Sequence, residues 1–240
     1  MIDKKNSNNI LGQRIKLLKP IKSFARRQGR MTAAQRIALD NHWAEYGIEL
    51  ASEPVDIKAL FHREAPTFLD IGFGMGDALV AMARAHPQWN FIGIEVYRAG
   101  VGKCLQGVMQ HGLTNVRFFN EDAVTVLAQA IPPHCIQGVF LWFPDPWPKK
   151  RHHKRRLVQI PFAQAIARCL EPQGYWHIAT DWLPYGEHVQ AVLGQCTEFV
   201  DISTTEKGMT YSARRLSTKY ERRGERLGHS IWDGIYQVVE

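Results

Sequence analysis

An aspartate held between two prolines, Asp145, stands directly before the densest run of positive charge in the chain. An apolar run over residues 138–143 leads into it, and residues 149–156 contain six lysines and arginines and no acid. Pro144 and Pro146 restrict the backbone, so the carboxylate is expected to be preorganised. A rigid carboxylate beside a cationic strip is typical of a reaction centre that borders a polyanion-binding surface.

Three glycines at alternate positions, Gly72, Gly74 and Gly76, follow an apolar run that contains Asp70. Glycines let backbone N–H groups approach a ligand closely at a helix N-terminus. The dinucleotide fingerprint G-x-G-x-x-G would place its third glycine one residue later. The tighter spacing, with an acid just before it, favours S-adenosylmethionine, whose amino-acid moiety and sulfonium suit a nearby carboxylate. Taken alone, the loop is equally compatible with an incidental glycine turn.

Two further acids, Glu95 and Asp122, follow the next two expected strands. An acid at the position of Glu95 grips ribose hydroxyls in nucleotide-cofactor enzymes, and Asp122 falls where an adenine amino group would sit. Ligands of parallel sheets bind outside the carboxyl ends of the strands, so these acids and Asp70 should converge on one crevice. Together they predict an S-adenosylmethionine site, and Asp145 would close the fourth strand where the methyl group points.

A single carboxylate limits the chemistry available at Asp145. An exocyclic amine would need a base to remove its proton, whereas guanine N7 already presents a lone pair. Methyl transfer to N7 needs positioning and stabilisation of the positive charge that develops, and a nearby carboxylate supplies both. Neither role requires a metal, so His152 and His153 are interpreted as RNA contacts or surface residues. Trp147 offers a face on which a base can stack.

A regular alternation of apolar runs and amphipathic segments must position these residues. A helix capped by Thr32 is expected to end at Tyr46. Five strands should alternate with five helices, the strands at 67–71, 91–96, 116–120, 138–143 and 175–180, and the helices at 77–85, 98–111, 123–130, 157–170 and 185–195. Late strands at 199–202 and 231–239 flank a polar, basic segment. This rhythm predicts a doubly wound α/β fold with a mostly parallel sheet covered on both faces.

The net charge of +7 is divided between an acidic body and three basic patches. Residues 1–30 carry +8, residues 149–156 carry +6, residues 214–226 carry +4, and the rest carries −11. Patches of one sign attract a partner of the other sign, most commonly nucleic acid. Residues 1–30, with Phe24 as their only aromatic residue, are expected to form a flexible arm ahead of one domain at 31–240.

Composition restricts the class of protein further. A chain of 240 residues, 45% of them hydrophobic, can bury a core as one domain with an appendage. No segment approaches transmembrane length and residues 1–9 have no apolar signal core, so no membrane partner is expected. The four cysteines form no C-x-x-C pair, which favours reduced thiols and a cytoplasmic protein.

Five motifs together make the chain similar to the bacterial tRNA (guanine-N7-)-methyltransferases of the TrmB type. They are Ile71-Gly-Phe-Gly-Met-Gly76, Gly93-Ile-Glu95-Val, Phe143-Pro-Asp-Pro-Trp-Pro-Lys149, Ala179-Thr-Asp181-Trp and Thr218-Lys-Tyr-Glu-Arg-Arg-Gly224. The similarity runs from about Arg26 to the C-terminus. It implies a class I (Rossmann-like) methyltransferase fold with a seven-stranded sheet, S-adenosylmethionine as methyl donor, and methylation of a guanine in the variable loop of tRNA.

The resemblance also implies roles for individual residues. The cofactor-contacting acids would be Asp70, Glu95, Asp122 and Asp145, together with the loop glycines, and Asp145 would also be the catalytic position. The substrate-binding positions would be Lys149, Asp181, Thr218, Lys219, Tyr220 and Glu221. We expect Lys149 near the base and residues 150–156 on the phosphate backbone. The family often has Glu at the position of Asp70, whose side chain is one methylene shorter.

Other functions remain open at this point. A nicotinamide-dependent oxidoreductase is disfavoured by the glycine spacing, by Asp122 and by the basic patches. A non-catalytic RNA-binding module is disfavoured by four intact strand-end acids. A methyltransferase that acts on another structured RNA stays possible. No obligate protein partner is evident, and the protein could be a monomer or a homodimer.

Overall fold

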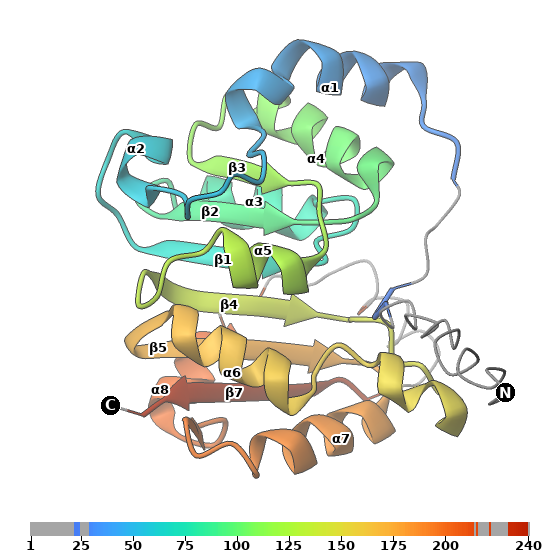
Figure 1. The fold of residues 1–240 in the computed structure, drawn as a ribbon, viewed down its shortest axis with the longest axis vertical. Coiled ribbons are helices and arrows are strands. Elements are labelled where there is room, and N and C mark those ends of the chain that lie inside the picture. Colours follow the sequence, from blue (N-terminus) through green and yellow to red (C-terminus); the bar gives the residue numbers. More distant parts are fainter. Residues whose placement is uncertain (1–21, 25–28, 214, 216–220, 222–229, 240) are drawn as a thin grey trace, which may run out of the picture.

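A seven-stranded sheet forms the centre of the molecule in the computed structural model, which describes residues 22–24, 29–213, 215, 221 and 230–239 (Figure 1). The strand order is β3–β2–β1–β4–β5–β7–β6. The bounds are Thr67–Ile71 for β1, Asn90–Ile94 for β2, Val116–Phe119 for β3, Ile136–Trp142 for β4, Leu170–Thr180 for β5, Phe199–Asp201 for β6 and Trp232–Val238 for β7. Only β7 runs antiparallel to its neighbours, which confirms the predicted seven-stranded, mostly parallel sheet.

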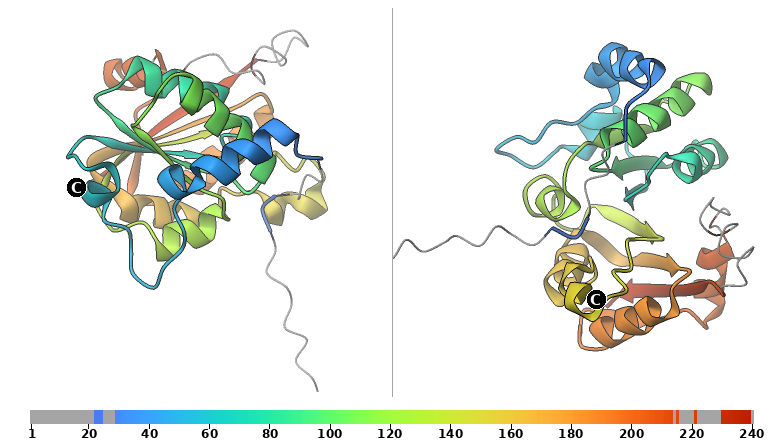
Figure 2. Two further views of the ribbon diagram at one scale, coloured as in Figure 1. Left: turned by 90° about the horizontal axis from the view of Figure 1, so that it is seen from above. Right: turned by 90° about the vertical axis from the view of Figure 1, so that its right-hand side faces the viewer.

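Helices cover both faces of this sheet (Figure 2). The helices that pack on one face are α2 (Ile57–Phe61), α5 (Ala123–Gln129), α6 (Ile160–Cys169) and α7 (Leu183–Leu193). The helices that pack on the other are α1 (Ala33–Tyr46), α3 (Asp77–Ala85), α4 (Arg98–Gln110) and α8 (Glu206–Ala213). Strands β1 and β2 are buried along their whole length, as expected of strands covered on both faces. No helix in the described part of the chain is long and apolar enough to cross a membrane.

Local sequence signals account for some of the element boundaries. Helix α1 begins at a capping box in which the Thr32 hydroxyl accepts from the Gln35 N–H and the Gln35 side chain accepts from the Thr32 N–H. Strand β1 and helix α3 have the predicted bounds. Strand β5 begins earlier than predicted, because Leu170 pairs with Ile136 before an irregularity that includes Glu171, Pro172 and Gln173. That stretch resembles a turn when it is considered without its neighbouring strand.

Besides α2, two further short elements are absent from the predicted pattern. The basic loop after β4 contains a 3-10 helix, η1 (Lys150–Arg155), and the polar segment before β7 contains α8. Neither has a continuous apolar face in the sequence. Their positions depend on contacts with the rest of the protein, for example the stacking of Tyr211 on Tyr175 at 3.9 Å between ring centroids.

The absence of a side chain at two glycines allows α4 to lie against the glycine loop. Gly76 has a left-handed backbone (φ +82°), and a β-carbon there would lie 2.2 Å from the Cys104 Sγ. A β-carbon on Gly100 would lie 2.2 Å from the carbonyl oxygen of Gly74. Both distances are far below van der Waals contact, so larger residues would push α4 away from the loop.

We therefore predict that Gly76→Ala lowers the free energy of unfolding by about 2–5 kcal/mol, since a left-handed alanine costs about 1–2 kcal/mol and the overlap with Cys104 adds about 1–3 kcal/mol. Urea denaturation of both proteins measures the difference in their free energies of unfolding. Gly112→Ala is the matched control, because Gly112 also has a left-handed backbone (φ +58°) but no atom within 4 Å of the added carbon. Equal losses in the two variants would contradict the packing argument.

Candidate active site

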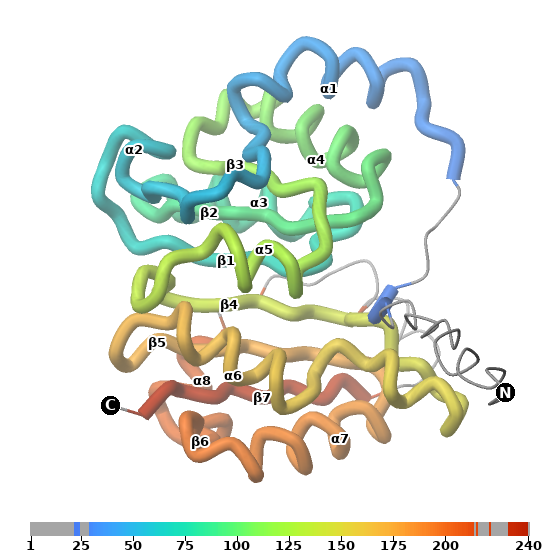
Figure 3. Tube along the Cα trace, viewed as in Figure 1, coloured from blue at the N-terminus to red at the C-terminus, as the bar shows by residue number. Residues whose placement is uncertain are grey.

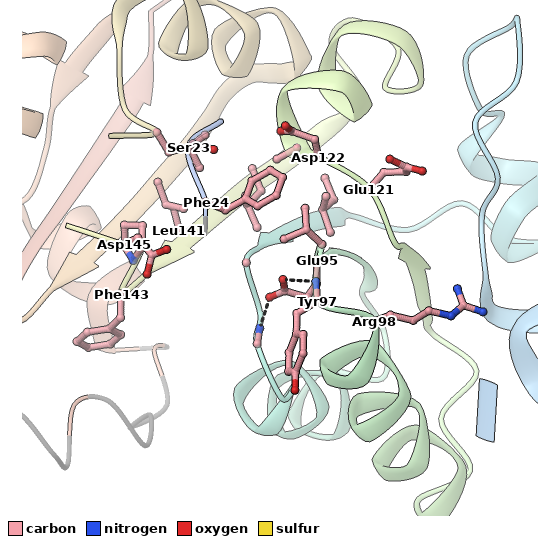
Figure 4. Close-up of a pocket in the computed structure, with 18 of the residues that line it drawn as sticks. Ser23, Phe24, Glu95, Tyr97, Arg98, Glu121, Asp122, Leu141, Phe143 and Asp145 are labelled. Atoms are coloured by element: carbon pink, nitrogen blue, oxygen red, sulfur yellow. Dashed lines mark hydrogen bonds between the residues drawn. The ribbon is translucent and has the colours of Figure 1, made fainter. Parts of the chain in front are cut away.

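A cavity of about 530 Å³ lies at the carboxyl ends of β1, β2 and β4 (Figure 4). Its volume is in the usual range for small-molecule sites, about 300–1,000 Å³. The predicted site residues that line it are Gly72, Gly74, Glu95, Asp122 and Asp145. Figure 4 shows Glu95 and Asp145 on opposite sides of the cavity. Three of the four predicted acids therefore lie at one cavity on the carboxyl edge of the sheet, whereas Asp70 does not line it.

The Glu95 carboxylate fixes the glycine loop to the end of β2. Its Oε2 accepts from the Gly74 N–H at 2.8 Å, and its Oε1 accepts from the Tyr97 N–H at 2.9 Å. The Gly72 N–H donates to the Ile94 carbonyl at 2.8 Å. Glu95 is 9% exposed and lines the cavity. Contact with a ribose stays a prediction.

Asp70 lies deeper than the other acids. It is 3% exposed and stands behind the residues that line the cavity. Burial and, to a smaller extent, the nearby charge of Glu95 together raise the pKa of this carboxyl to about 7. Two acids this close repel each other, and a cation in the cavity would offset the repulsion. The ammonium and sulfonium groups of S-adenosylmethionine fit this requirement.

Asp122 has a structural contact as well as a place in the cavity wall. Its side chain caps α5 by accepting from the Val124 N–H at 3.0 Å. Gly76 differs from the other two loop glycines, because it is not among the residues that line the cavity and it provides space for Cys104. Its predicted part in cofactor binding would therefore be exerted through the shape of the loop.

Asp145 sits on a turn with two left-handed residues that are not glycine, Phe143 (φ +55°) and Trp147 (φ +45°). Such backbone is strained and persists only where neighbours hold it. The Phe143 N–H donates to the Ala179 carbonyl at 2.8 Å, and the Trp147 indole N–H donates to the Ser23 carbonyl at 2.8 Å. Asp145 itself is exposed at the cavity edge.

Residues near the N-terminus complete the cavity, which sequence reasoning did not predict. Ser23, Phe24, Gly29 and Met31 all line it. The segment at 22–24 lies beside the end of β4 (Figure 3). The one available signal was Phe24, the only aromatic residue in an otherwise polar, basic stretch. Residues 1–21 and 25–28 are outside the described residues, so the flexible arm stays a prediction.

The predicted substrate-binding residues are only partly described. Lys149 precedes η1 and is exposed, and Asp181 follows β5, the strand next to β4, without lining the cavity. Thr218, Lys219 and Tyr220 lie outside the described residues. Within the described residues no group of three or more His, Cys, Asp or Glu side chains could hold a metal ion. The expectation that no metal is needed stays a prediction.

Glu221 is part of a buried ionic network. Both of its carboxylate oxygens accept from Arg215 at 2.8 Å, and the same guanidinium donates to both oxygens of Asp233 at 3.1 and 3.0 Å. Asp233 also contacts the His177 Nε2 at 2.7 Å. Burial alone would lower the pKa of Arg215, but the two carboxylates raise it. The guanidinium lies 5.9 Å from the Phe143 ring centroid, which links this network to the Asp145 turn.

The fold and the acid-lined cavity define the class I methyltransferases. Two solved structures with this fold are the aminoglycoside resistance methyltransferase NpmB1 (TM-score 0.51, 19% identity, covering 80% of this chain and 95% of that one) and the 16S rRNA methyltransferase KamB (TM-score 0.51, 15% identity, covering 78% and 95%). At this identity they show the fold alone. Residues 64–234 match the model of the family described as "Putative methyltransferase".

Closer relatives identify the family more narrowly. A tRNA (guanine-N(7)-)-methyltransferase of Cronobacter sakazakii is 50% identical over 93% of both chains. One of Hydrogenovibrio crunogenus is 49% identical over 91% of both chains, and one of Escherichia coli is 47% identical over 93% of both chains. The chain belongs to the tRNA (guanine-N(7)-)-methyltransferase family. This membership excludes the nicotinamide-dependent oxidoreductase considered from the sequence.

The raised pKa of Asp70 predicts that S-adenosylmethionine binding releases a proton. A bound cation favours the ionised carboxylate, so near pH 7 about half a proton should leave on binding. Affinity should rise by up to about tenfold per pH unit as the pH approaches 7 from below, and level off above it. Calorimetry in buffers of different ionisation enthalpy measures the release.

Asp70→Asn is the control for this measurement. The amide has nearly the same shape but carries no proton that binding could release, so the dependence on buffer should disappear. Binding heats of the unsubstituted protein that are identical in all buffers would contradict the prediction.

Proposed function

We propose that this protein transfers the methyl group of S-adenosylmethionine to N7 of the variable-loop guanine of tRNA. The observation that carries the proposal is the position of Asp145, at the edge of an acid-lined cavity and directly before a strip of exposed cations. The names of the relatives, which are about half identical over nearly the whole chain, support the same reaction.

The proposed reaction needs little from the protein beyond placement and charge. The N7 lone pair attacks the methyl carbon, the carbon–sulfur bond breaks, and its electron pair stays on sulfur as the neutral thioether leaves. Guanine becomes cationic, and the Asp145 carboxylate stabilises that charge. The carboxylate can also accept from the guanine N1–H and 2-amino groups, which selects guanine. No proton has to be removed during methyl transfer.

The surface next to Asp145 suits a folded RNA. Lys149, Lys150, Arg151 and Lys154 are exposed on or beside η1 and can contact phosphates. We infer that Lys149 and Asp181 contact the nucleotide, together with Thr218, Lys219, Tyr220 and Glu221. Because tRNA is the substrate, the protein would work in the cytoplasm, as a monomer or a homodimer with no obligate partner of another kind.

Incubation of a bulk tRNA pool with the protein and S-adenosylmethionine tests the reaction. A methylated N7 makes the nucleoside labile, so reduction and aniline treatment should cleave tRNA in the variable loop. Cleavage at that loop supports the proposed site. Methylation of other RNA classes, with none in tRNA, would favour the methyltransferase of another structured RNA.

In the same assay, Asp145→Asn should lower the methyl-transfer rate at saturating substrates by about 100-fold or more, as the loss of one preorganised charge-stabilising group does. Its affinity for S-adenosylmethionine should change by less than about threefold, because Asp145 is exposed at the edge of the cavity. Asp122→Asn provides the contrast, since its larger expected effect is on cofactor affinity. A parallel loss of rate and cofactor affinity in Asp145→Asn would reduce Asp145 to a cofactor ligand.

Deletion of residues 1–20 should weaken tRNA binding and flatten its dependence on salt. The deleted segment contains five lysines and arginines, and each lost phosphate contact lowers the slope of log K against log salt by about 0.7–0.9. Filter binding at several salt concentrations measures the slope. Lys58→Gln removes a cation that pairs with Glu64 elsewhere on the surface and should leave the slope unchanged. An unaltered slope in the truncated protein would leave the arm without a role in binding.

A further inference from the structure

Arg156 ends the basic run at 149–156, but its side chain lies inside the protein. It is 4% exposed, whereas Lys150, Arg151 and Lys154 are exposed. The sequence predicts one phosphate-binding strip over residues 150–156. The structure divides that strip, because a guanidinium with almost no access to solvent cannot be reached by a tRNA phosphate without rearrangement.

The guanidinium of Arg156 holds three separate segments at the edge of the cavity. Its Nε–H donates to the Pro146 carbonyl at 3.0 Å, one terminal nitrogen donates to the Pro184 carbonyl at 3.5 Å, and the other donates to the His153 Nε2 at 3.2 Å. These acceptors belong to the Asp145 turn, to the start of α7 and to η1. The central carbon of the guanidinium, Cζ, lies 5.4 Å from the Tyr185 ring centroid.

None of these partners is a carboxylate, and the ion pairs among the described residues do not include Arg156. A buried cation with neutral partners is costly, and only good hydrogen bonds reduce that cost. An apolar residue beside Tyr185 would fill the same space without the free-energy cost of a buried charge. The arrangement is therefore better explained by what the guanidinium holds in place than by a gain in stability.

The Pro146 carbonyl is the point at which this contact affects the reaction. Pro146 directly follows Asp145, and the turn includes the strained residues Phe143 and Trp147. A hydrogen bond to this carbonyl fixes the orientation of the Pro146–Trp147 peptide plane, one residue beyond Asp145. Asp145 and Arg156 also both act on the pKa of Tyr185, which burial raises, Arg156 lowers and Asp145 raises. The two charged groups thus lie around the same buried ring.

We propose that Arg156 is a positioning residue that fixes the Pro146 carbonyl and so aims the Asp145 carboxylate, and that it does not bind tRNA phosphate. The proposal rests on the proposed function for the reaction that Asp145 serves. Arg156 would then hold the protein backbone, whereas the exposed cations of the same run would contact phosphates.

Arg156→Gln and Arg156→Lys test the proposal in the full-length protein with a bulk tRNA pool. Both variants lose the three-way guanidinium contact, so the single-turnover rate of methyl transfer at saturating tRNA should fall by about 100-fold, as expected when a reacting group is displaced by about 1 Å. The salt slope of tRNA binding and the affinity for S-adenosylmethionine should stay at their unsubstituted values.

Lys154→Gln is the matched loss of one charge from the same run. Because Lys154 is exposed, this variant should lower the salt slope by about 0.7–0.9, the value for one phosphate contact. If Arg156→Gln lowers the slope equally, or if Arg156→Lys keeps the rate of the unsubstituted protein, Arg156 is a phosphate contact and the proposal is wrong. Thermal melting checks folding, and if Arg156→Gln does not fold, the lysine variant decides.

Amide hydrogen exchange gives a readout that does not depend on the reaction. Only Phe143, Asp145 and Trp147 have N–H groups in the turn, and their exchange should be faster in both Arg156 variants. Unaltered exchange would overturn the proposal. If the unsubstituted protein transfers no methyl group to tRNA, the proposed function fails, and the exchange measurement still decides whether Arg156 holds the turn.

Discussion

The hydrogen bonds of the Glu95 carboxylate constrain the side of the cavity that the glycine loop forms. By accepting from the Gly74 and Tyr97 amides, this one side chain joins the loop after β1 to the loop after β2. The loop can take that path only because Gly100 of α4 has no side chain, since a β-carbon there would lie 2.2 Å from the Gly74 carbonyl oxygen. The Asp70 carboxyl lies nearby, and burial together with the charge of Glu95 raises its pKa. The Glu95 side chain therefore affects both the path of the glycine loop and the electrostatics of the cavity.

The Asp145 turn shows how the protein stabilises a strained segment without glycine. Phe143 and Trp147 both have left-handed backbones, a conformation that costs about 1–2 kcal/mol for each residue. Contacts from distant parts of the chain hold the turn: Ser23 on the Trp147 indole, Arg156 on the Pro146 carbonyl, and Arg215 over the Phe143 ring. These contacts come from the N-terminal segment, from the residue that follows η1 and from the region before β7. The position of the carboxylate is thus coupled to several surfaces that RNA could touch.

Positive charge serves two different purposes in this protein. The exposed lysines and arginines of η1 provide a surface that can attract phosphates, and they make few contacts with the body. Arg156 is buried and the Arg215 side chain is 9% exposed, and their guanidinium groups use several donors at once to hold backbone or carboxylates. The planar fork of arginine suits this second purpose, whereas either residue type suits the first. A count of charges along the sequence does not distinguish the exposed cations from the arginines that hold the protein together.

The sequence by itself determined the mostly parallel sheet, the glycine loop and the four strand-end acids. These features follow from short-range rules: apolar runs of strand length, glycine spacing, and the fact that parallel strands end at one edge. The capping box at Thr32 and the bounds of β1 and α3 were predictable for the same reason. Only the tertiary structure decided that Phe24 lines the cavity, that Asp70 is buried behind it, and that Arg156 faces inward. Each of these depends on contacts between residues far apart in the chain, and such contacts leave no periodic signal in the sequence.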